Sequence, residues 1–255
     1  MDLGLTDRVY VITGATRGLG FASAQQLVAE GARVVVTGRS AEAAEAAAAE
    51  LGEGRAVGVA ADNADPAAPA RLVEAARSHF GRLDGVLVSV GGPPAGVPVT
   101  EVDDEQWRSA FDSVFLGAVR MARAVAAELT EGGVIGFVLS SSVHEPVPGL
   151  GISNGLRPGL AGFAKTLANE LGPRGIRVLG LLPGRIGTER LAYLDSLADG
   201  ADGSAARKRN AETIPLRRYG SPEEFGRTAA FLLSPAASYL TGVMLPVDGG
   251  ARHGF

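Results

Sequence analysis

Short runs of apolar, β-branched residues alternate with segments of helical pattern along the whole chain. The expected strands cover residues 8–13, 33–37, 55–60, 86–90, 134–139, 176–182 and 244–247. The expected helices cover residues 19–30, 41–51, 66–80, roughly 101–130, 156–171 and 222–233. Parallel strands need a crossover between them, usually a helix. The order therefore predicts a single-domain α/β fold over residues 1–255, a Rossmann-like doubly wound parallel β-sheet with helices on both faces.

Glycine is unusually frequent, at 36 of 255 residues, about twice the roughly 7% of average proteins. The glycines follow no period, and they stand among strong apolar runs, which excludes collagen and a flexible linker. We therefore expect tight turns and places where backbone approaches backbone or a ligand.

Charge and composition exclude several classes of protein. Lys and Arg number 24 against 28 Asp and Glu, so the net charge is −4 and the pI ≈ 5.5, which argues against nucleic acid as a partner. Cysteine is absent, which excludes disulfides, thiolate nucleophiles and Cys-ligated zinc. Without a long apolar run or a secretion signal at the start, we expect no membrane contact and a cytoplasmic location.

The segment TGATRGLG, residues 13–20, directly follows the first expected strand and opens the first expected helix. Glycines there permit a tight turn and let a pyrophosphate approach the helix N-terminus, whose free N–H groups and dipole favour negative charge. A glycine motif alone is weak evidence, but the strand–turn–helix context favours a dinucleotide site over a merely tight turn.

The spacing T-G-x-x-x-G-x-G resembles that of the short-chain dehydrogenases/reductases, and later segments resemble the family in the same order. These segments are Asp62-Asn63, which resembles the acidic position that contacts adenine; Ser89-Val90-Gly91-Gly92, where the family usually has Asn-Asn-Ala-Gly; Pro183-Gly184 with Thr188; and Leu240-Thr241-Gly242 through Pro246–Gly250. The resemblance covers essentially the whole chain. It implies a nicotinamide cofactor, a small-molecule carbonyl or alcohol substrate and no metal.

The cofactor-binding residues that the resemblance implies are Gly14, Thr16, Arg17, Gly18, Leu19, Gly20, Arg39, Asp62, Asn63, Ser89, Gly91, Arg157, Pro183, Gly184, Ile186 and Thr188. Sites for NAD place Asp or Glu near the end of the second strand, whereas Arg accommodates a 2′-phosphate. Here that strand ends in Thr37-Gly38-Arg39 without a carboxylate. Arg39, with Arg17 as a second cation, therefore favours NADP(H), although either could be a solvated surface charge.

The family's catalytic group is a Ser, a Tyr-x-x-x-Lys and an upstream Asn. The run Ser140-Ser141-Ser142 follows the fifth expected strand, where the serine belongs. Alignment on residues 163–168 puts Ser153 at the Tyr position and Arg157 at the Lys position, and Val114 takes the place of the Asn. The resemblance therefore implies a catalytic set of Ser140, Ser142, Ser153 and Arg157, with altered proton delivery.

Such a set can transfer protons less readily than the family's Tyr and Lys. A serine hydroxyl is a much weaker acid than a phenol, and Arg effectively never deprotonates. Ser142, Ser153 and Asn154 could polarise a substrate oxygen, with water as the proton source. His144 is either a catalytic acid or an ordinary loop histidine. Because Pro158 favours a first helical turn, Ser153 and Arg157 are expected to flank the helix start.

Three functions remain open. The first is an NADPH-dependent carbonyl reductase acting on a 3-oxoacyl- or ketone-like substrate. The second is a non-catalytic NADP(H)-binding sensor or assembly subunit, and the third is a non-redox enzyme such as a lyase or isomerase on the same scaffold.

Two expectations concern the rest of the molecule. The composition of residues 195–210 predicts a polar, mobile insertion, and we expect residues 188–210 to form a lid over the substrate. By resemblance to the family, we also expect a homo-oligomer, a tetramer or a dimer.

Overall fold

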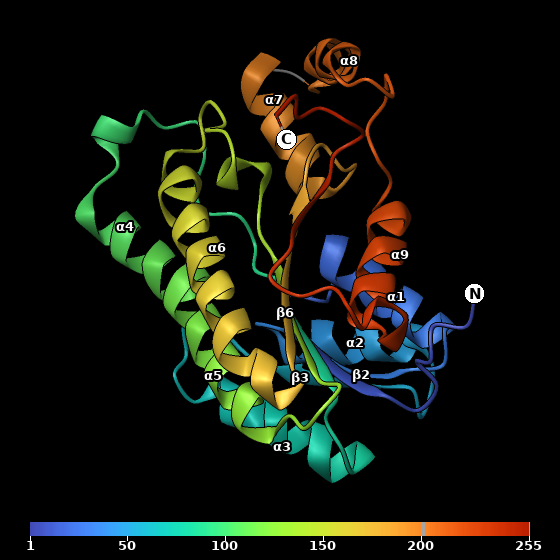
Figure 1. The fold of residues 1–255 in the computed structure, drawn as a ribbon. Helices are drawn as coiled ribbons and strands as arrows, with labels where there is room; N and C mark the ends of the chain where they lie inside the picture. The colour runs from blue at the N-terminus through green and yellow to red at the C-terminus, as the bar shows by residue number, and fades with distance from the viewer. Residues whose placement is uncertain (200–201, 255) are drawn as a thin grey trace.

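The computed structural model describes residues 1–199 and 202–254. Within this part of the chain, seven strands form one parallel sheet in the order β3-β2-β1-β4-β5-β6-β7. Figure 1 shows the sheet enclosed by helices. The strands are β1 (Val9–Ile12), β2 (Arg33–Gly38), β3 (Ala56–Ala60), β4 (Gly85–Val88), β5 (Val134–Val138), β6 (Arg177–Pro183) and β7 (Met244–Val247). The order reverses between β1 and β4, and the carboxyl edge of a doubly wound sheet at such a point is where ligands bind.

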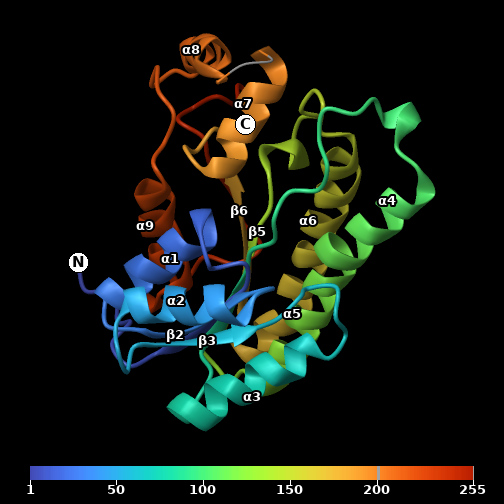
Figure 2. The same ribbon diagram turned by 180° about the vertical axis from the view of Figure 1, so that it is seen from behind.

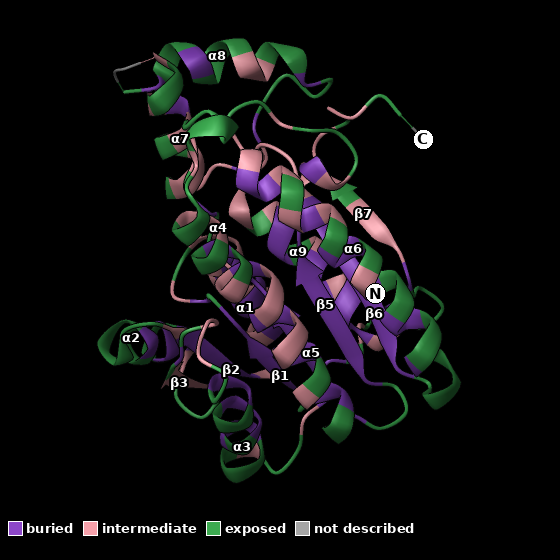
Figure 3. Ribbon diagram, turned by 90° about the vertical axis from the view of Figure 1, so that its left-hand side faces the viewer, coloured by how far each residue is buried: buried purple, intermediate pink, exposed green. Residues whose placement is uncertain are grey.

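Helices cover both faces of the sheet (Figure 2). One face packs against α1 (Gly18–Ala29), α2 (Ala41–Leu51) and α9 (Pro222–Leu233). The other packs against α3 (Ala68–Phe80), α5 (Gly117–Glu128) and α6 (Gly151–Leu171). Every residue of β1, β4 and β5 is buried (Figure 3), as expected for parallel strands covered on both sides. The doubly wound Rossmann-like fold expected from the sequence is confirmed.

The long helical stretch expected over residues 101–130 is interrupted. It consists of α4 (Asp104–Ala110), a π-helical segment (Phe111–Leu116) and α5. A short 3₁₀ helix, Val99–Glu101, precedes α4. Val114 is buried within the π-helical segment. Such segments insert an extra residue into a helix, and periodicity over a long apolar stretch does not reveal them.

The start of the helix expected over residues 156–171 was wrong by five residues, because α6 begins at Gly151 and not at residue 156. Ser153 and Arg157 therefore lie inside the helix and do not flank its start. Pro158 lies in the helix interior, where it has no N–H to donate to the carbonyl of Asn154. Separately, the Asn154 side chain is bonded to the loop before α6. Its amide oxygen accepts from the Val147 N–H at 3.1 Å, and its amide nitrogen donates to the Val147 carbonyl at 2.9 Å.

Much of the polar stretch over residues 195–210 is helical. The segment after β6 forms α7 (Glu189–Asp199) and α8 (Ser204–Thr213), while residues 200 and 201 lie outside the described residues. Whether this stretch is an insertion stays a prediction, and its polar composition did not indicate the two helices.

The helices α1 and α9 lie side by side in close contact. A Cβ at Gly226 of α9 would collide with the carbonyl oxygen of Ala22 on α1. Glycine at this position therefore permits the two backbones to approach each other, and the position of α1 depends on it.

We predict that Gly226→Ala lowers the free energy of unfolding by about 1–3 kcal/mol, because the methyl group forces the two helices apart. Gly162→Ala is the matched control, since Gly162 lies within α6 and a Cβ there would meet no neighbouring atom within 4 Å. It should leave stability unchanged or raise it by about 0.5–1 kcal/mol. Urea denaturation measures both changes, and equal effects of the two substitutions would contradict the packing argument.

Candidate functional site

The carboxyl ends of β1 and β4 are joined directly. The Thr13 hydroxyl donates to the carbonyl of Ser89 at 2.8 Å and accepts from its N–H at 2.9 Å. Both residues are buried. A Cβ at Gly14 would lie 2.5 Å from the Ser89 carbonyl oxygen. The motif after β1 is therefore packed against the segment after β4 at the point where the sheet order reverses.

The glycine-rich turn is shaped to receive a ligand. Gly14 and Gly18 have left-handed backbone, with φ of 56° and 60°, which glycine adopts without strain. The N-cap residue of α1 makes no side-chain cap bond, and the first turn of α1 carries no acidic residue. The free N–H groups and the helix dipole thus fit the pyrophosphate of a dinucleotide. A Cβ at Gly20 would lie 2.5 Å from the Gly14 carbonyl, which keeps α1 close to the turn, and Leu19 packs on the core beneath.

The two cations expected near the adenosine differ in their surroundings. Arg39, at the end of β2, is exposed and forms no ion pair with any described carboxylate. Arg17 forms an ion pair with Glu189 of α7 at 2.6 Å. Thr16 packs closely on Gly38, and a Cβ at Gly38 would collide with the methyl group of Thr16. Arg39 is therefore the cation without a competing carboxylate.

The expected adenine segment follows β3. The Asp62 carboxylate accepts from the Ala64 N–H at 2.9 Å, which stabilises the turn. The Asn63 carbonyl packs on Gly117, where any Cβ would collide with it. This contact fixes the segment to the start of α5.

Arg157 is buried between the ends of β4 and β5. Its guanidinium donates to the carbonyl of Val138, and to that of Val90 at 3.4 Å. Burial lowers the pKa of Arg157 to about 10, so the side chain remains charged at neutral pH. Among the described residues no carboxylate pairs with it, and its Nε has no partner. The geometry makes Arg157 a clamp between two strand ends.

The serines after β5 have different roles. The Ser140 hydroxyl accepts from the Ser142 N–H at 3.1 Å and caps the short helix Ser141–Val143. The Ser142 hydroxyl is buried and has no partner among the described residues. Ser153 is also buried. His144 is exposed on the loop. Ser142 is therefore the polar group most in need of a ligand.

The segment after β6 continues the same edge. The Gly184 N–H donates to the Val247 carbonyl at 3.0 Å, and Ile186 is buried beside Gly220. The Thr188 hydroxyl accepts from the Leu191 N–H at 3.3 Å and caps the first turn of α7. Thr188 also lies opposite Gly18, whose Cβ would be 3.8 Å from the threonine methyl group.

The first turn of α7 contacts both sides of this edge, a feature that sequence reasoning missed. Glu189 pairs with Arg17 of the glycine-rich turn. Arg190 donates to the Pro93 carbonyl at 2.6 Å and lies against Gly92. Burial lowers the pKa of Arg190. Only the neighbouring charges of Glu189-Arg190 mark these residues in the sequence, and such pairs are common on solvated helices.

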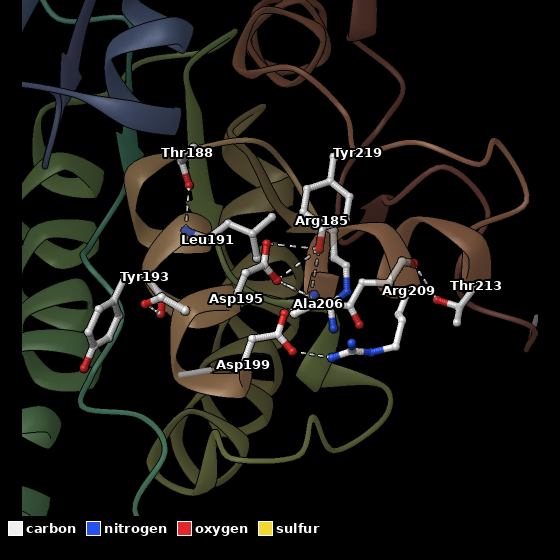
Figure 4. Close-up of polar contacts among 12 residues, drawn as sticks. Arg185, Thr188, Leu191, Tyr193, Asp195, Asp199, Ala206, Arg209, Thr213 and Tyr219 are labelled. Carbon is white, nitrogen blue, oxygen red and sulfur yellow. Dashed lines mark hydrogen bonds and ion pairs between the residues drawn. The ribbon is translucent and has the colours of Figure 1, made fainter. Parts of the chain in front are cut away.

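A polar cluster holds α7 and α8 together (Figure 4). Asp195 is buried, and its carboxylate accepts from the Tyr219 hydroxyl at 3.0 Å and from Asn210 at 3.1 Å. Arg185 lies 3.5 Å from the same carboxylate. A second carboxylate, Asp199, pairs with Arg209 at 2.5 Å. These bonds fasten the segment expected to be a mobile insertion.

Within the described residues no helix is long and apolar enough to cross a membrane, and no cluster of candidate metal ligands occurs.

Comparisons with known proteins agree with this arrangement. The family model described as enoyl-(acyl carrier protein) reductase matches residues 14–252. The 3-oxoacyl-[acyl-carrier-protein] reductase of Synechocystis is 34% identical over 252 residues, covering 96% of this chain and 97% of the relative. The short-chain reductase protein NovJ of Streptomyces niveus is 34% identical over 250 residues, covering 96% and 94%.

A solved structure of L-sorbose reductase from Gluconobacter frateurii, complexed with NADPH and L-sorbose, matches with a TM-score of 0.91 at 32% identity. The match covers 100% of both chains. With the parallel sheet, the glycine-rich turn and these relatives in agreement, the chain belongs to the short-chain dehydrogenase/reductase family, whose members are NAD(P)-dependent oxidoreductases.

Proposed function

We propose that the protein is an NADP(H)-dependent reductase of a 3-oxoacyl- or ketone-like carbonyl compound, with an altered proton-delivery site. The observation that carries the proposal is the buried, unpartnered hydroxyl of Ser142 at the carboxyl edge of the sheet, to which no described residue bonds. A buried polar group without a partner costs stability unless a ligand completes its hydrogen bonding.

The cofactor assignment rests on the residues at the sheet edge. The N-terminus of α1 would hold the pyrophosphate, Arg39 the 2′-phosphate, and Thr188 with Pro183-Gly184 the nicotinamide end. Asp62-Asn63 would lie along the adenine, and Ser89 with Gly91 along the nicotinamide ribose. The NADPH in the related L-sorbose reductase structure supports a nicotinamide cofactor of this type.

The bound cofactor would supply the hydride, and this chain's residues would position and polarise the carbonyl group. Ser142 donates a hydrogen bond to the carbonyl oxygen, and Ser153 lies in the first turns of α6 as a second hydroxyl. Ser153 and Arg157 stand where the family has Tyr and Lys, so water delivers the proton. Arg157 acts through the Val90 carbonyl, because this bond fixes the backbone next to Ser89 and Gly91.

One set of contacts favours a second candidate, a non-catalytic NADP(H)-binding subunit. Arg157 is bonded to two backbone carbonyls, and the Asn154 amide is bonded to Val147. Only the Nε of Arg157 is left without a described partner, so most of the polar groups of these two side chains are already bonded within the protein. Turnover of NADPH with ketones, quinones and β-ketoacyl thioesters separates the two candidates. Tight NADPH binding without turnover of any of these compounds would exclude the reductase and favour the non-catalytic binding subunit.

We further propose that α7 and α8 cover the substrate and that the protein is a homo-oligomer. The contacts of Glu189 and Arg190 with both sides of the sheet edge support a cover.

We predict that Arg39→Ala weakens NADPH binding about tenfold, equivalent to about 1.4 kcal/mol, and changes NADH binding much less. The reason is that only NADPH carries the 2′-phosphate that the guanidinium would bind. Titration calorimetry with both cofactors measures the difference. Arg227→Ala removes another exposed arginine, on α9, and serves as the control. Equal affinities of the wild-type protein for NADPH and NADH would contradict the assignment.

Arg157→Ala is expected to lower the free energy of unfolding by about 2 kcal/mol or more, because it leaves two strand-end carbonyls without donors. It should also raise the NADPH dissociation constant and lower turnover, since the Val90 segment is released. Arg157→Lys keeps a donor and should restore part of both properties. Unchanged stability and NADPH affinity in Arg157→Ala would show that the clamp has no role.

We expect Ser142→Ala to lower turnover by about tenfold to a hundredfold, less than the loss of a donor from an acyl-transfer site, while NADPH affinity stays the same. Ser140→Ala is the matched control. It removes a hydroxyl bonded to the turn, so it should reduce thermal stability more than it reduces turnover. Steady-state kinetics with calorimetric binding tests the pair, and an undiminished kcat in Ser142→Ala would remove Ser142 from the mechanism.

A further inference from the structure

A second concentration of positive charge lies away from the glycine-rich turn, beside α8. Four basic side chains and the ring of Tyr219 line a hollow of ≈ 380 Å³. Arg207 and Lys208 come from α8, and Arg217 and Arg218 come from the segment that leads to α9. No acidic side chain of the described residues lines the hollow. The hollow is wide open to solvent.

Most of this charge has no acidic partner in the described part of the chain. Arg218 pairs with Glu224 through two bonds of 2.7 and 2.6 Å, which holds the pKa of Glu224 at about 2. Arg207 lies over the Tyr219 ring, 4.8 Å from its centre. Among the described residues, no carboxylate forms an ion pair with Arg207, Lys208 or Arg217. The chain as a whole carries a net charge of −4 and contains two lysines, so this excess of positive charge is local.

The backbone of Arg217 is strained. Its φ is 56°, and Asp7 is the other described non-glycine residue with a positive φ. A long side chain in this region costs free energy that glycine avoids. Strained residues persist where the surrounding structure holds them, and they concentrate at ligand sites. The Arg217 side chain lines the hollow, and its guanidinium donates to the carbonyl of Glu212 in the last turn of α8.

We propose that this hollow, the α8 pocket, binds the phosphate or pyrophosphate group of a small molecule. Arginine fits phosphate because its planar fork donates two parallel hydrogen bonds, and Lys208 adds a point charge. The α8 pocket is separate from the proposed cofactor site, and the proposal does not depend on the reductase assignment.

The α8 pocket is connected to α7 through its own residues. The Tyr219 hydroxyl donates to Asp195 on α7, and Asn210 at the far end of α8 donates to the same carboxylate. An anion bound between α8 and Arg217 would join two segments that both bond to Asp195. Binding should therefore slow amide hydrogen exchange in α8 and in α7.

Inorganic pyrophosphate is the probe, titrated by calorimetry into the full-length protein at about 0.15 M salt, where interactions between distant exposed charges are screened. We expect saturable binding that Lys208→Ala and Arg217→Gly each weaken about fivefold. Arg217→Gly is the sharper variant, because it removes the cation and also relieves the positive-φ strain. Its thermal stability should stay close to that of the wild type, because relief of the strain offsets the lost bond to the Glu212 carbonyl, so lost binding would not reflect unfolding.

Two controls separate the α8 pocket from other anion sites. Lys165→Ala removes the other lysine, which is exposed on α6, and Arg227→Ala removes an exposed arginine on α9. Both should bind pyrophosphate as the wild type does. A titration with saturating NADPH, which would fill the proposed cofactor site including the N-terminus of α1, should give the same pyrophosphate binding. The proposal is overturned if the wild type shows no saturable binding, if sulfate binds as tightly as pyrophosphate, or if NADPH abolishes binding that Arg217→Gly leaves intact. The reductase assignment is tested separately, by NADPH affinity and turnover.

Discussion

The hydroxyl of Thr13 connects the two strands at which the sheet order reverses, and the rest of the site depends on this connection. It bonds both backbone groups of Ser89, and the missing side chain of Gly14 lets the two segments touch. Because β1 and β4 are parallel neighbours, their following segments leave the sheet in diverging directions from this joint. The N-terminus of α1 is thereby held beside the segment of Gly91. A larger residue at position 14 would separate the phosphate-binding turn from the strand ends that face it.

A buried positive charge governs the opposite end of the site. Arg157 has no described carboxylate partner, and carbonyl dipoles alone compensate its charge. Removing an ion from water costs several kcal/mol before such compensation. A cation kept there despite that cost lies one helical turn after Ser153 on α6. The same guanidinium bridges the end of β5 and the segment that follows β4.

The sheet was predictable because strands buried on both faces are continuous apolar runs, and the glycine-rich turn because its spacing is tied to a strand before and a helix after it. The start of α6 was not predictable, since a proline inside a helix looks in sequence like a first-turn residue. The sequence also did not reveal which group each polar side chain bonds to. Sequence brings Ser140, Ser142 and Asn154 together as candidates, yet two are bonded to nearby backbone and one hydroxyl has no described partner. Such distinctions depend on positions set by tertiary packing.

The contact between α1 and α9 has a consequence for how the chain acquires its structure during synthesis. The apolar cluster that includes Tyr10 of β1 and Leu27 of α1 is completed by Phe225 and its neighbours in α9. An N-terminal fragment that ends before α9 would therefore leave the apolar face of this cluster in water. Contacts between such distant segments form slowly, because the chain loses the entropy of a long loop before the contacts stabilise the fold. This apolar face therefore stays uncovered during synthesis until α9 has been made.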